Sequence, residues 1–258
     1  MKLAKVEGLY HPNLLINGDF QVNQRGNTRY EIGDLTYTFD RWCGSGWMSI
    51  EKTSNGVKVQ NNADINSNQW FMQKLETHLS GTFTLSVKVI SKNGKAVAKI
   101  ESTDSLIDQV DLSVGDNVLT VNTEDLAIIT IEIGGSTTYA DYVEIAYIKL
   151  EQGSIATPFI PRLYAEELIL CKRYYRLIYL SHSEYIASTS NEAYFVENFE
   201  QEMRTTPTIN IKDIGTVTNI ANLGYYAYPN RINFHYRATN AGFTRMINRL
   251  YEIEAEIY

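Results

Sequence analysis

Residues 82–89, Thr82-Phe83-Thr84-Leu85-Ser86-Val87-Lys88-Val89, alternate strictly between polar and apolar side chains. In an extended chain successive side chains point to opposite faces, so this stretch predicts a strand with one buried face. Asn93-Gly94 follows, and this pair favours the positive backbone angles of a tight turn. We therefore predict that residues 95–101 return beside residues 82–89 as a β-hairpin.

Other segments before residue 160 have similar strand character and are separated by Gly, Asn, Asp and Ser residues. The candidates are Leu14–Asn17, Tyr37–Trp42, Trp47–Lys52, Gly56–Gln60, Gln69–Leu75, Asn117–Val121, Leu126–Ile133 and Tyr139–Leu150. Many short antiparallel strands joined by turns are typical of a β-sandwich or jelly roll. The fold class predicted for this part is therefore all-β.

Composition changes near residue 160. Lys outnumbers Arg before this point and Arg outnumbers Lys after it, and most of the 18 Tyr lie in the second part. Pro158 and Pro161 stand at the change, where a connector between domains is expected. We predict an N-terminal arm at residues 1–12, a jelly-roll domain at 13–160 and a second domain at 161–258.

The second domain is predicted to open with a short helix and then return to strands. Tyr164, Leu168, Cys171 and Tyr175 follow a helical spacing just after Pro161. This apolar stripe either packs in the domain core or contacts another copy of the chain. The strand candidates that follow are Tyr174–Leu180, Ala193–Glu200, Thr208–Lys212, Arg231–Ala238 and Arg249–Tyr258. The expected result is a C-terminal β-sandwich-like domain.

Composition also narrows the function classes. The 258 residues carry a formal charge of −7, which disfavours a nucleic-acid partner because phosphate binding needs an excess of Lys and Arg. The chain has neither a signal-peptide pattern nor an apolar run long enough to span a bilayer, so we expect synthesis in the cytoplasm and no membrane insertion. Cys43 and Cys171 lie far apart, and both are expected to be reduced and packed.

No motif for catalysis is present in the sequence. It lacks a nucleophile elbow, a phosphate-binding glycine loop, a dinucleotide fingerprint and a pair of His at metal-binding spacing. We therefore predict that the protein is not an enzyme. A glycan-degrading enzyme stays an alternative, because two carboxylates from distant strands can meet in a folded chain.

Several motifs resemble the phage and prophage tail-fibre or receptor-binding proteins that begin with a carbohydrate-binding-module-like jelly roll. The opening motifs are NLLINGDFQVNQRG at residues 13–26 and YTFDRW at 37–42. KLEQGSIATPFIPR at residues 149–162 is similar to the family's last strand and exit segment, and FEQEMRTTPT at 199–208 to a phrase of its C-terminal domain. The resemblance covers about residues 13 to 210.

The resemblance implies a virion structural protein made in the host cytoplasm, usually a homotrimer, that projects from a phage particle and contacts the host surface. A host glycan is a candidate ligand there, but the resemblance does not imply that sugar binding is retained, because the jelly roll can also serve as a spacer. Its other partners would be virion proteins. The alternative is an assembly or adaptor component that binds virion proteins only. Related modules carry a structural calcium, for which Asp19 and Asp141 are the matching candidates here. No other cofactor is expected.

Aromatic side chains are the candidate glycan contacts, because a ring stacks on the face of a sugar. Trp47 and Trp70 lie near polar turns, whereas Trp42 ends an alternating segment and is expected in the core. Core packing is also the commoner outcome for Trp47 and Trp70. Tyr225, Tyr226 and Tyr228 are predicted on a loop of the second domain and are preferred to the tryptophans, because loops carry binding more often than packed strands do.

Overall fold

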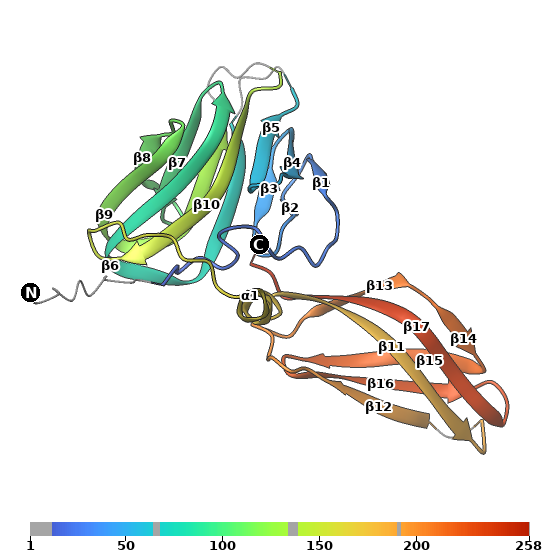
Figure 1. The fold of residues 1–258 in the computed structure, drawn as a ribbon. Helices are drawn as coiled ribbons and strands as arrows, with labels where there is room; N and C mark the ends of the chain where they lie inside the picture. The colour runs from blue at the N-terminus through green and yellow to red at the C-terminus, as the bar shows by residue number, and fades with distance from the viewer. Residues whose placement is uncertain (1–11, 64–67, 134–138, 190–191, 258) are drawn as a thin grey trace, which may run out of the picture. The chain divides into compact units, whose positions relative to one another are not determined.

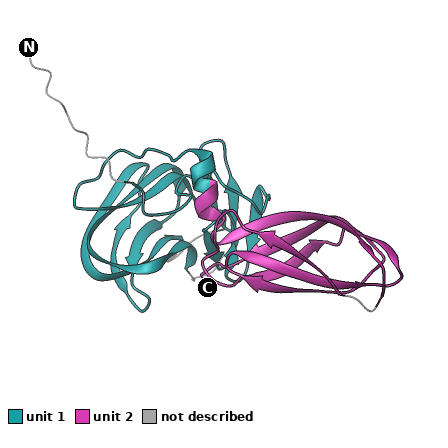
Figure 2. Cartoon of the chain, turned by 90° about the horizontal axis from the view of Figure 1, so that it is seen from below, with its two compact units in different colours: residues 1–167 teal, residues 168–258 magenta. Residues whose placement is uncertain are grey.

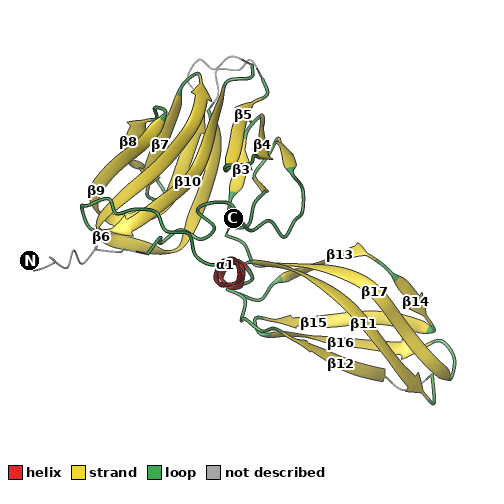
Figure 3. Cartoon of the chain, viewed as in Figure 1, coloured by secondary structure: helices red, strands yellow, loops and turns green. Residues whose placement is uncertain are grey.

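The computed structural model describes residues 12–63, 68–133, 139–189 and 192–257. The predicted arm at residues 1–12 therefore lies almost entirely outside the described residues. The chain divides into two compact units, residues 1–167 and 168–258 (Figure 2). Both units consist of antiparallel strands, and the described residues form a single helix (Figure 3). The chain is all-β and sandwich-like, as the alternating segments predict.

Unit 1 contains the strands before residue 160, and they are labelled in Figure 1. They are β1 (Arg29–Ile32), β2 (Thr36–Tyr37), β3 (Cys43–Ser45), β4 (Met48–Lys52), β5 (Val57–Asn61), β6 (Gln69–Asn93), β7 (Ala96–Glu101), β8 (Leu106–Asp111), β9 (Gly115–Ile133) and β10 (Tyr142–Gln152). The segments expected to hold β4, β5 and β10 are confirmed to within a few residues. The predicted strands at Gln69–Leu75 and at residues 82–89 are parts of one strand, β6, which is 25 residues long.

The long strands β6 and β9 connect two layers of unit 1. Layer A has the order β1-β4-β5-β10-β6-β9 and uses the second half of β6 and the first half of β9. Layer B has the order β3-β6-β9-β7-β8 and uses the opposite halves of the same two strands. The pairing of β6 with β9 shifts register between Lys74 and Gly81, where β6 passes from one layer to the other.

A single apolar core lies between the layers. Phe83, Leu85 and Val87 of layer A and Phe71, Ile100 and Ile129 of layer B belong to the same cluster of buried side chains. Trp42 is completely buried in this core and its ring stacks on Phe71, which confirms its prediction. Each strand places alternate side chains in the cluster, so its remaining side chains line the two outer faces.

The predicted hairpin at Asn93-Gly94 is wrong. Gly94 does adopt a positive φ of 80°, as the turn requires. However, β7 pairs with β8 and β9, whereas β6 pairs with β3, β9 and β10. The turn therefore carries the chain from layer A to layer B instead of reversing it beside its own strand.

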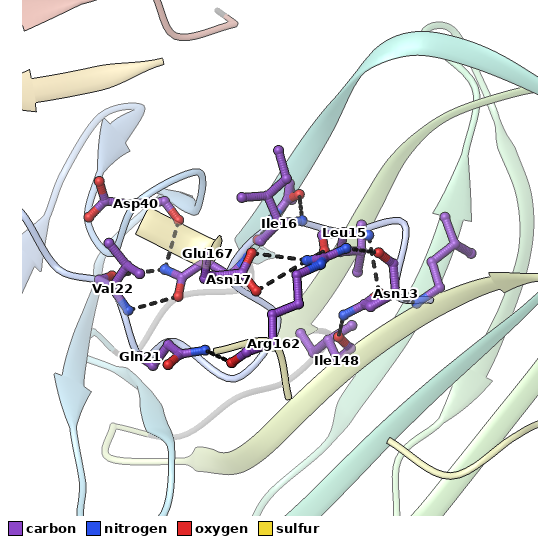
Figure 4. A network of polar contacts seen from close by, with 12 residues as sticks. Asn13, Leu15, Ile16, Asn17, Gln21, Val22, Asp40, Ile148, Arg162 and Glu167 are labelled. Atoms are coloured by element: carbon purple, nitrogen blue, oxygen red, sulfur yellow. Dashed lines mark hydrogen bonds and ion pairs between the residues drawn. The ribbon is translucent and has the colours of Figure 1, made fainter. Parts of the chain in front are cut away.

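Leu14–Asn17 and Tyr37–Trp42 are not the strands that we predicted. Asn17 and Arg41 have positive φ values, of 58° and 71°, which interrupt extended backbone. Side chains take the place of a strand ladder in the first segment: Asn13 donates to Ile148 O at 2.9 Å and accepts from the Leu15 and Leu150 amides (Figure 4). Of residues 37–42, only Tyr37 lies in a strand.

The same N-terminal segment is bonded to the end of unit 1. Glu167 is buried and accepts hydrogen bonds from the Asn17 amide at 2.6 Å and from the Arg162 guanidinium at 3.0 and 3.1 Å (Figure 4). Arg162 also donates to the carbonyls of Asn13 and Leu15. A charge-assisted network of this kind fixes both ends of unit 1 against each other.

Residues 153–158 cross the outer face of layer A, and we call them the exit segment. Thr84 donates from its hydroxyl to Gly153 O at 2.7 Å. Lys149 Nζ lies 3.0 Å from Glu151 Oε1 and donates to Thr157 O at 3.0 Å, and all three residues are buried. The exit segment is thus held by hydrogen bonds to the strands beneath it.

Unit 2 is a sandwich of two small sheets. One has the order β11-β17-β13, with β14 beside β17, and the other has the order β12-β16-β15. Their bounds are β11 (Tyr175–Ile186), β12 (Glu192–Asn198), β13 (Thr208–Asp213), β14 (Thr216–Thr218), β15 (Ile220–Tyr228), β16 (Arg231–Ala238) and β17 (Gly242–Glu254). The alternation in β16 is confirmed, because Ile232, Phe234 and Tyr236 are buried.

The predicted helix is present as α1 (Tyr164–Cys171), eight residues long. Tyr175 lies beyond its end, at the start of β11, so the apolar stripe is one position shorter than predicted. Cys171 is buried, as is Cys43, and among the described residues neither forms a disulfide. Among the described residues, no helix has the length and apolar character that crossing a membrane requires.

Candidate functional site

The outer face of layer B carries an exposed tryptophan. Phe71 of β6 points into the core and is fully buried, so its neighbour Trp70 points outward, where 41% of it is exposed. Trp70 is paired in register with Glu132 of β9. Glu132 in turn is paired with Val97 of β7 on the other side of β9.

Hydrogen bonds hold the indole of Trp70 in place. Its Nε1 donates to Glu132 Oε2 at 2.9 Å, and Lys99 Nζ donates to the same oxygen. Glu132 is largely buried, and Lys99 neutralises its charge. The ring is thus oriented by its polar edge, while part of its surface stays open to solvent.

A pocket of about 310 Å³ lies beside this ring. Its lining consists of Trp70, Met72, Glu101, Ser102, Thr103, Asp104, Ser105, Leu106, Ile128 and Thr130. The wall formed by the loop between β7 and β8 is braced internally, because Ser102 N donates to Ser105 O at 2.9 Å and Ser105 N donates to Ser102 Oγ at 3.0 Å. The floor comes from strand residues and the rim from this short polar loop.

The chemistry of the pocket favours a neutral ligand with many hydroxyl groups. Glu101 and Asp104 supply carboxylate acceptors, and Ser102, Thr103 and Ser105 are hydroxyl-bearing residues. Among the described residues no Lys or Arg lines the pocket, so the charged groups that an anionic ligand would meet in this lining are the carboxylates of Glu101 and Asp104. The exposed ring of Trp70 supplies an apolar surface on which the C–H face of a sugar can stack.

Trp47 is more exposed than Trp70, at 64%, and does not line the pocket. It follows β3, in which Ser45 is paired in register with Trp70. Core packing was the commoner expectation for both tryptophans, and the structure places both at the surface. Of the two, Trp70 is the one that lines the pocket described above.

The tyrosines of the second domain do not lie on a loop. Tyr225, Tyr226 and Tyr228 belong to β15, which pairs with β16. The Tyr225 hydroxyl donates to Ile209 O at 3.1 Å, and the Tyr226 ring stacks on His235 with centroids 5.1 Å apart. The segment forms a strand because its backbone pairs with β16 and completes the sheet, while Leu223 and Ala227 pack partly against the core of unit 2.

These rings are engaged within unit 2 to different degrees. Tyr226 is 59% exposed, whereas Tyr225 and Tyr228 are about 40% exposed. Arg231 lies over the Tyr228 ring, 4.8 Å from its centroid. Because each ring already has an intramolecular partner, only part of each remains for a ligand.

Asp19 and Asp141 are not brought together. Asp19 follows Gly18, whose carbonyl accepts from the Ile148 amide of β10, whereas Asp141 directly precedes β10. Seven positions of extended strand separate Ile148 from Asp141, roughly 20 Å at 3.3 Å per residue, so the two carboxylates cannot bind the same ion. In the described part of the chain, no group of three or more His, Cys, Asp or Glu side chains is arranged to hold a metal.

The polar residues around Trp70 were not predicted from the sequence. Glu132, which holds the indole, is the one acidic residue in the mainly apolar segment Leu126–Ile133, where burial of a charge requires a partner. Glu101 and the loop Ser102–Ser105 gave no comparable signal, because short polar loops are common between strands. Their proximity to Trp70 depends on the pairing of β7 with β9, which the mistaken hairpin excluded.

No family model matches the sequence, and no curated protein matches it. Solved structures are similar at low identity. TmCBM61 in complex with beta-1,4-galactotriose is 15% identical over 55% of this chain and 99% of that chain, with a TM-score of 0.37. The tailspike protein 4 enzymatically active domain of bacteriophage CBA120 is 12% identical over 54% of this chain and 21% of that chain, with a TM-score of 0.33.

A third solved structure, PfGH50B, is 13% identical over 42% of this chain and 22% of that chain, with a TM-score of 0.32. The chain thus spans about a fifth of the length of PfGH50B and of the tailspike domain. Because all three similarities are weak, the description of this chain as all-β and sandwich-like rests on its own strands and core.

Proposed function

We propose that this protein is a non-catalytic glycan-binding subunit, and that the pocket beside Trp70 receives a neutral glycan. The observation that carries the proposal is a partly exposed indole, fixed by Glu132, beside a pocket whose rim is rich in hydroxyls and carboxylates. Ligand pockets combine an apolar surface with a few polar groups that set orientation, and this pocket has both.

The biological setting that we propose is a phage fibre or receptor-binding protein located in the virion. The support is the resemblance of the motifs at residues 13–26, 37–42 and 149–162 to such proteins. In that setting the glycan belongs to the host surface, and other virion proteins anchor the subunit. Binding at a single sugar pocket is weak, so multiple copies would supply the avidity.

Exposed aromatic side chains on unit 2 support self-assembly, which we propose to be trimeric. Tyr179, Tyr185 and Phe243 are each more than half exposed, and the last two rings contact each other at 5.4 Å. Clusters of exposed apolar side chains mark interaction surfaces in soluble proteins. This surface also suits the alternative, an assembly component that contacts virion proteins only.

A glycan array with matched variants tests the binding site. Trp70→Ala should weaken binding to the glycans recognised by the unmodified protein by about tenfold or more, because it removes both stacking and apolar contact. Trp47→Ala is the control, since Trp47 is exposed and lies outside the pocket. Equal binding by Trp70→Ala and the unmodified protein would reject the pocket as the site.

The array also separates the competing functions. An array without any signal, from a protein that still self-associates, would favour the assembly component. Loss of binding only in the double variant Tyr226→Ser/Tyr228→Ser would move the site to β15; Tyr225 is left unchanged because its hydroxyl bonds to Ile209.

Catalysis is tested on the same ligands. Glu101 and Asp104 line one pocket, which is the arrangement that a glycan-degrading enzyme would require. We expect no new reducing ends after incubation with a bound glycan. Cleavage that is lost in Glu101→Gln or Asp104→Asn would overturn the proposal that the protein is non-catalytic.

A further inference from the structure

A second pocket, of about 320 Å³, lies on the outer face of layer A beside the exit segment. Its lining consists of Ser86, Val87, Asp116, Asn117, Val118, Tyr147, Ala156, Thr157 and Pro158. The floor comes from β6, β9 and β10, which are hydrogen-bonded neighbours in layer A. This pocket shares no residue with the pocket beside Trp70, which lies on layer B.

Ser86 has an unused hydroxyl group in this pocket. The residue is only 8% exposed, and its Oγ has no hydrogen-bond partner among the described residues. Register pairing places Ser86 between Val118 of β9 and Lys149 of β10. Because a buried hydroxyl without a partner is unfavourable, its presence in a pocket points to a ligand that supplies the partner.

Asp116 and Tyr147 supply further polar groups. One oxygen of the Asp116 carboxylate bonds to Lys88 Nζ at 3.0 Å in a solvent-exposed pair, and the Tyr147 hydroxyl also hydrogen-bonds to this carboxylate. Burial raises the pKa of Tyr147, and the negative charge of Asp116 raises it further, so the phenol keeps its proton at neutral pH. The pocket therefore offers a carboxylate acceptor, a phenol and the free hydroxyl of Ser86.

Apolar side chains form most of the remaining lining of the pocket. Val118 is half exposed there, and Pro158 belongs to the exit segment, which is tied down through Thr157 and Lys149. The Tyr147 ring stacks on Phe159, with centroids 4.3 Å apart and planes inclined by 6°. A sugar ring presents an apolar C–H face and polar hydroxyl groups. The pocket offers a matching surface for each, apolar side chains for the C–H face and hydroxyl and carboxylate groups for the sugar hydroxyls.

We propose that this pocket binds a single neutral hexose-sized ring, with Ser86 and Asp116 as hydrogen-bond partners. Its volume lies at the lower end of the range for ligand pockets, roughly 300 to 1,000 Å³, so it accommodates one ring and not a long chain. Asp116 disfavours an acidic sugar, and Lys88 beside it disfavours a cation. Unit 1 thus has two saccharide sites, one on each outer face.

Amide chemical shifts recorded during titration with glucose, galactose, mannose and glucuronic acid test the proposal. At least one neutral hexose should shift the amides of Ser86 and Val118 saturably at millimolar concentration, and glucuronic acid should bind more weakly. Ser86→Ala should weaken binding about five- to tenfold, the effect of one hydrogen bond. The same variant should not lower the melting temperature, because the hydroxyl that it removes has no partner in the free protein.

Two further variants keep the test independent of the pocket beside Trp70. Val118→Trp should fill this pocket and abolish the shifts, whereas Trp70→Ala should leave them unchanged. No saturable shift with any of the three neutral hexoses would overturn the proposal, as would equal affinity in Ser86→Ala and the unmodified protein. Loss of the shifts in Trp70→Ala would show that the pocket is not a separate site.

Discussion

At the scale of single residues, the ion pair between Lys149 and Glu151 makes a sharp prediction. Both side chains are almost completely buried. Replacing one partner leaves the other charge buried without its counterion, so Lys149→Met should lower the free energy of unfolding of unit 1 by about 3 to 5 kcal/mol. Urea unfolding measures this loss. The double variant Lys149→Met/Glu151→Leu leaves no unpaired charge, so it should lose less free energy of unfolding than Lys149→Met. Equal losses in the two variants would show that the ion pair itself is unimportant for stability.

Asp40 predicts a pH dependence of stability. Burial raises its pKa above the usual 3.8, although the Gln24 amide donates to its Oδ2 at 2.7 Å. The folded protein therefore keeps a proton on Asp40 at pH values where the unfolded chain has lost it. As pH rises from the unfolded to the folded pKa, this residue lowers the free energy of unfolding.

Asp40→Asn removes this titration. We compare the free energy of unfolding of the unmodified protein with that of Asp40→Asn. The difference, unmodified minus variant, should fall as pH rises above about 3.9, the pKa of Asp in an unfolded chain, and become constant above the pKa of Asp40 in the folded protein. Unfolding curves at a series of pH values measure the difference. A difference that is independent of pH across this range would contradict a raised pKa for Asp40.

Individual residues show what the sequence does and does not predict. The core position of Trp42 is predicted from its place at the end of an alternating segment that contains Phe39, and that position is correct even though residues 38–42 do not form the predicted strand. The pocket beside Trp70 was not predicted, because Glu101 and Thr130 reach it from strands that lie far from Trp70 in the sequence. A side chain's environment follows from local alternation, but a pocket depends on which strands become neighbours.

At the scale of elements, Gly81 is where β6 leaves one layer for the other. Its φ of +132° is rarely adopted by residues with a side chain, yet a Cβ there would make only ordinary contacts with the Phe83 ring. Gly81→Ala should therefore destabilise unit 1 by about 1 to 3 kcal/mol through the backbone alone. Thermal or urea unfolding measures the effect.

Gly33 provides the matched control. A Cβ at Gly33 meets nothing within 4 Å, and its φ lies outside the positive range. Gly33→Ala should leave stability unchanged or raise it by about 0.4 to 1 kcal/mol, because it restricts the unfolded chain. Equal effects of the two substitutions would mean that the bend in β6 does not depend on the conformation of Gly81.

The elements were predicted better than their pairing. Strand character between turn residues located β4, β5 and β10, and strict alternation is present in β16, which has one buried face. Asn93-Gly94 correctly predicts a turn, but a turn does not specify whether the chain reverses in its own layer or crosses to the opposite one. Gly224 and Pro229 flank the tyrosines of β15 and predict a loop there, whereas backbone pairing with β16 makes the segment a strand.

At the scale of the whole molecule, self-assembly is the testable property. If the exposed rings of Tyr179, Tyr185 and Phe243 mark a contact between copies, light scattering on the intact protein should give the mass of three chains. Tyr185→Ser/Phe243→Ser should shift the mass toward one chain without lowering the stability of unit 1. A single chain at micromolar concentration, for the unmodified protein, would contradict the trimer.

The N-terminal segment of unit 1 has a consequence for biosynthesis. Asn13 bonds to Ile148, 135 positions later, and Asn17 bonds to Glu167, 150 positions later. A ribosome must therefore complete nearly all of unit 1 before this segment finds its partners. Contacts of such high sequence separation make folding slow, so nascent chains expose the apolar side of β6 for longer than a fold of local hairpins would.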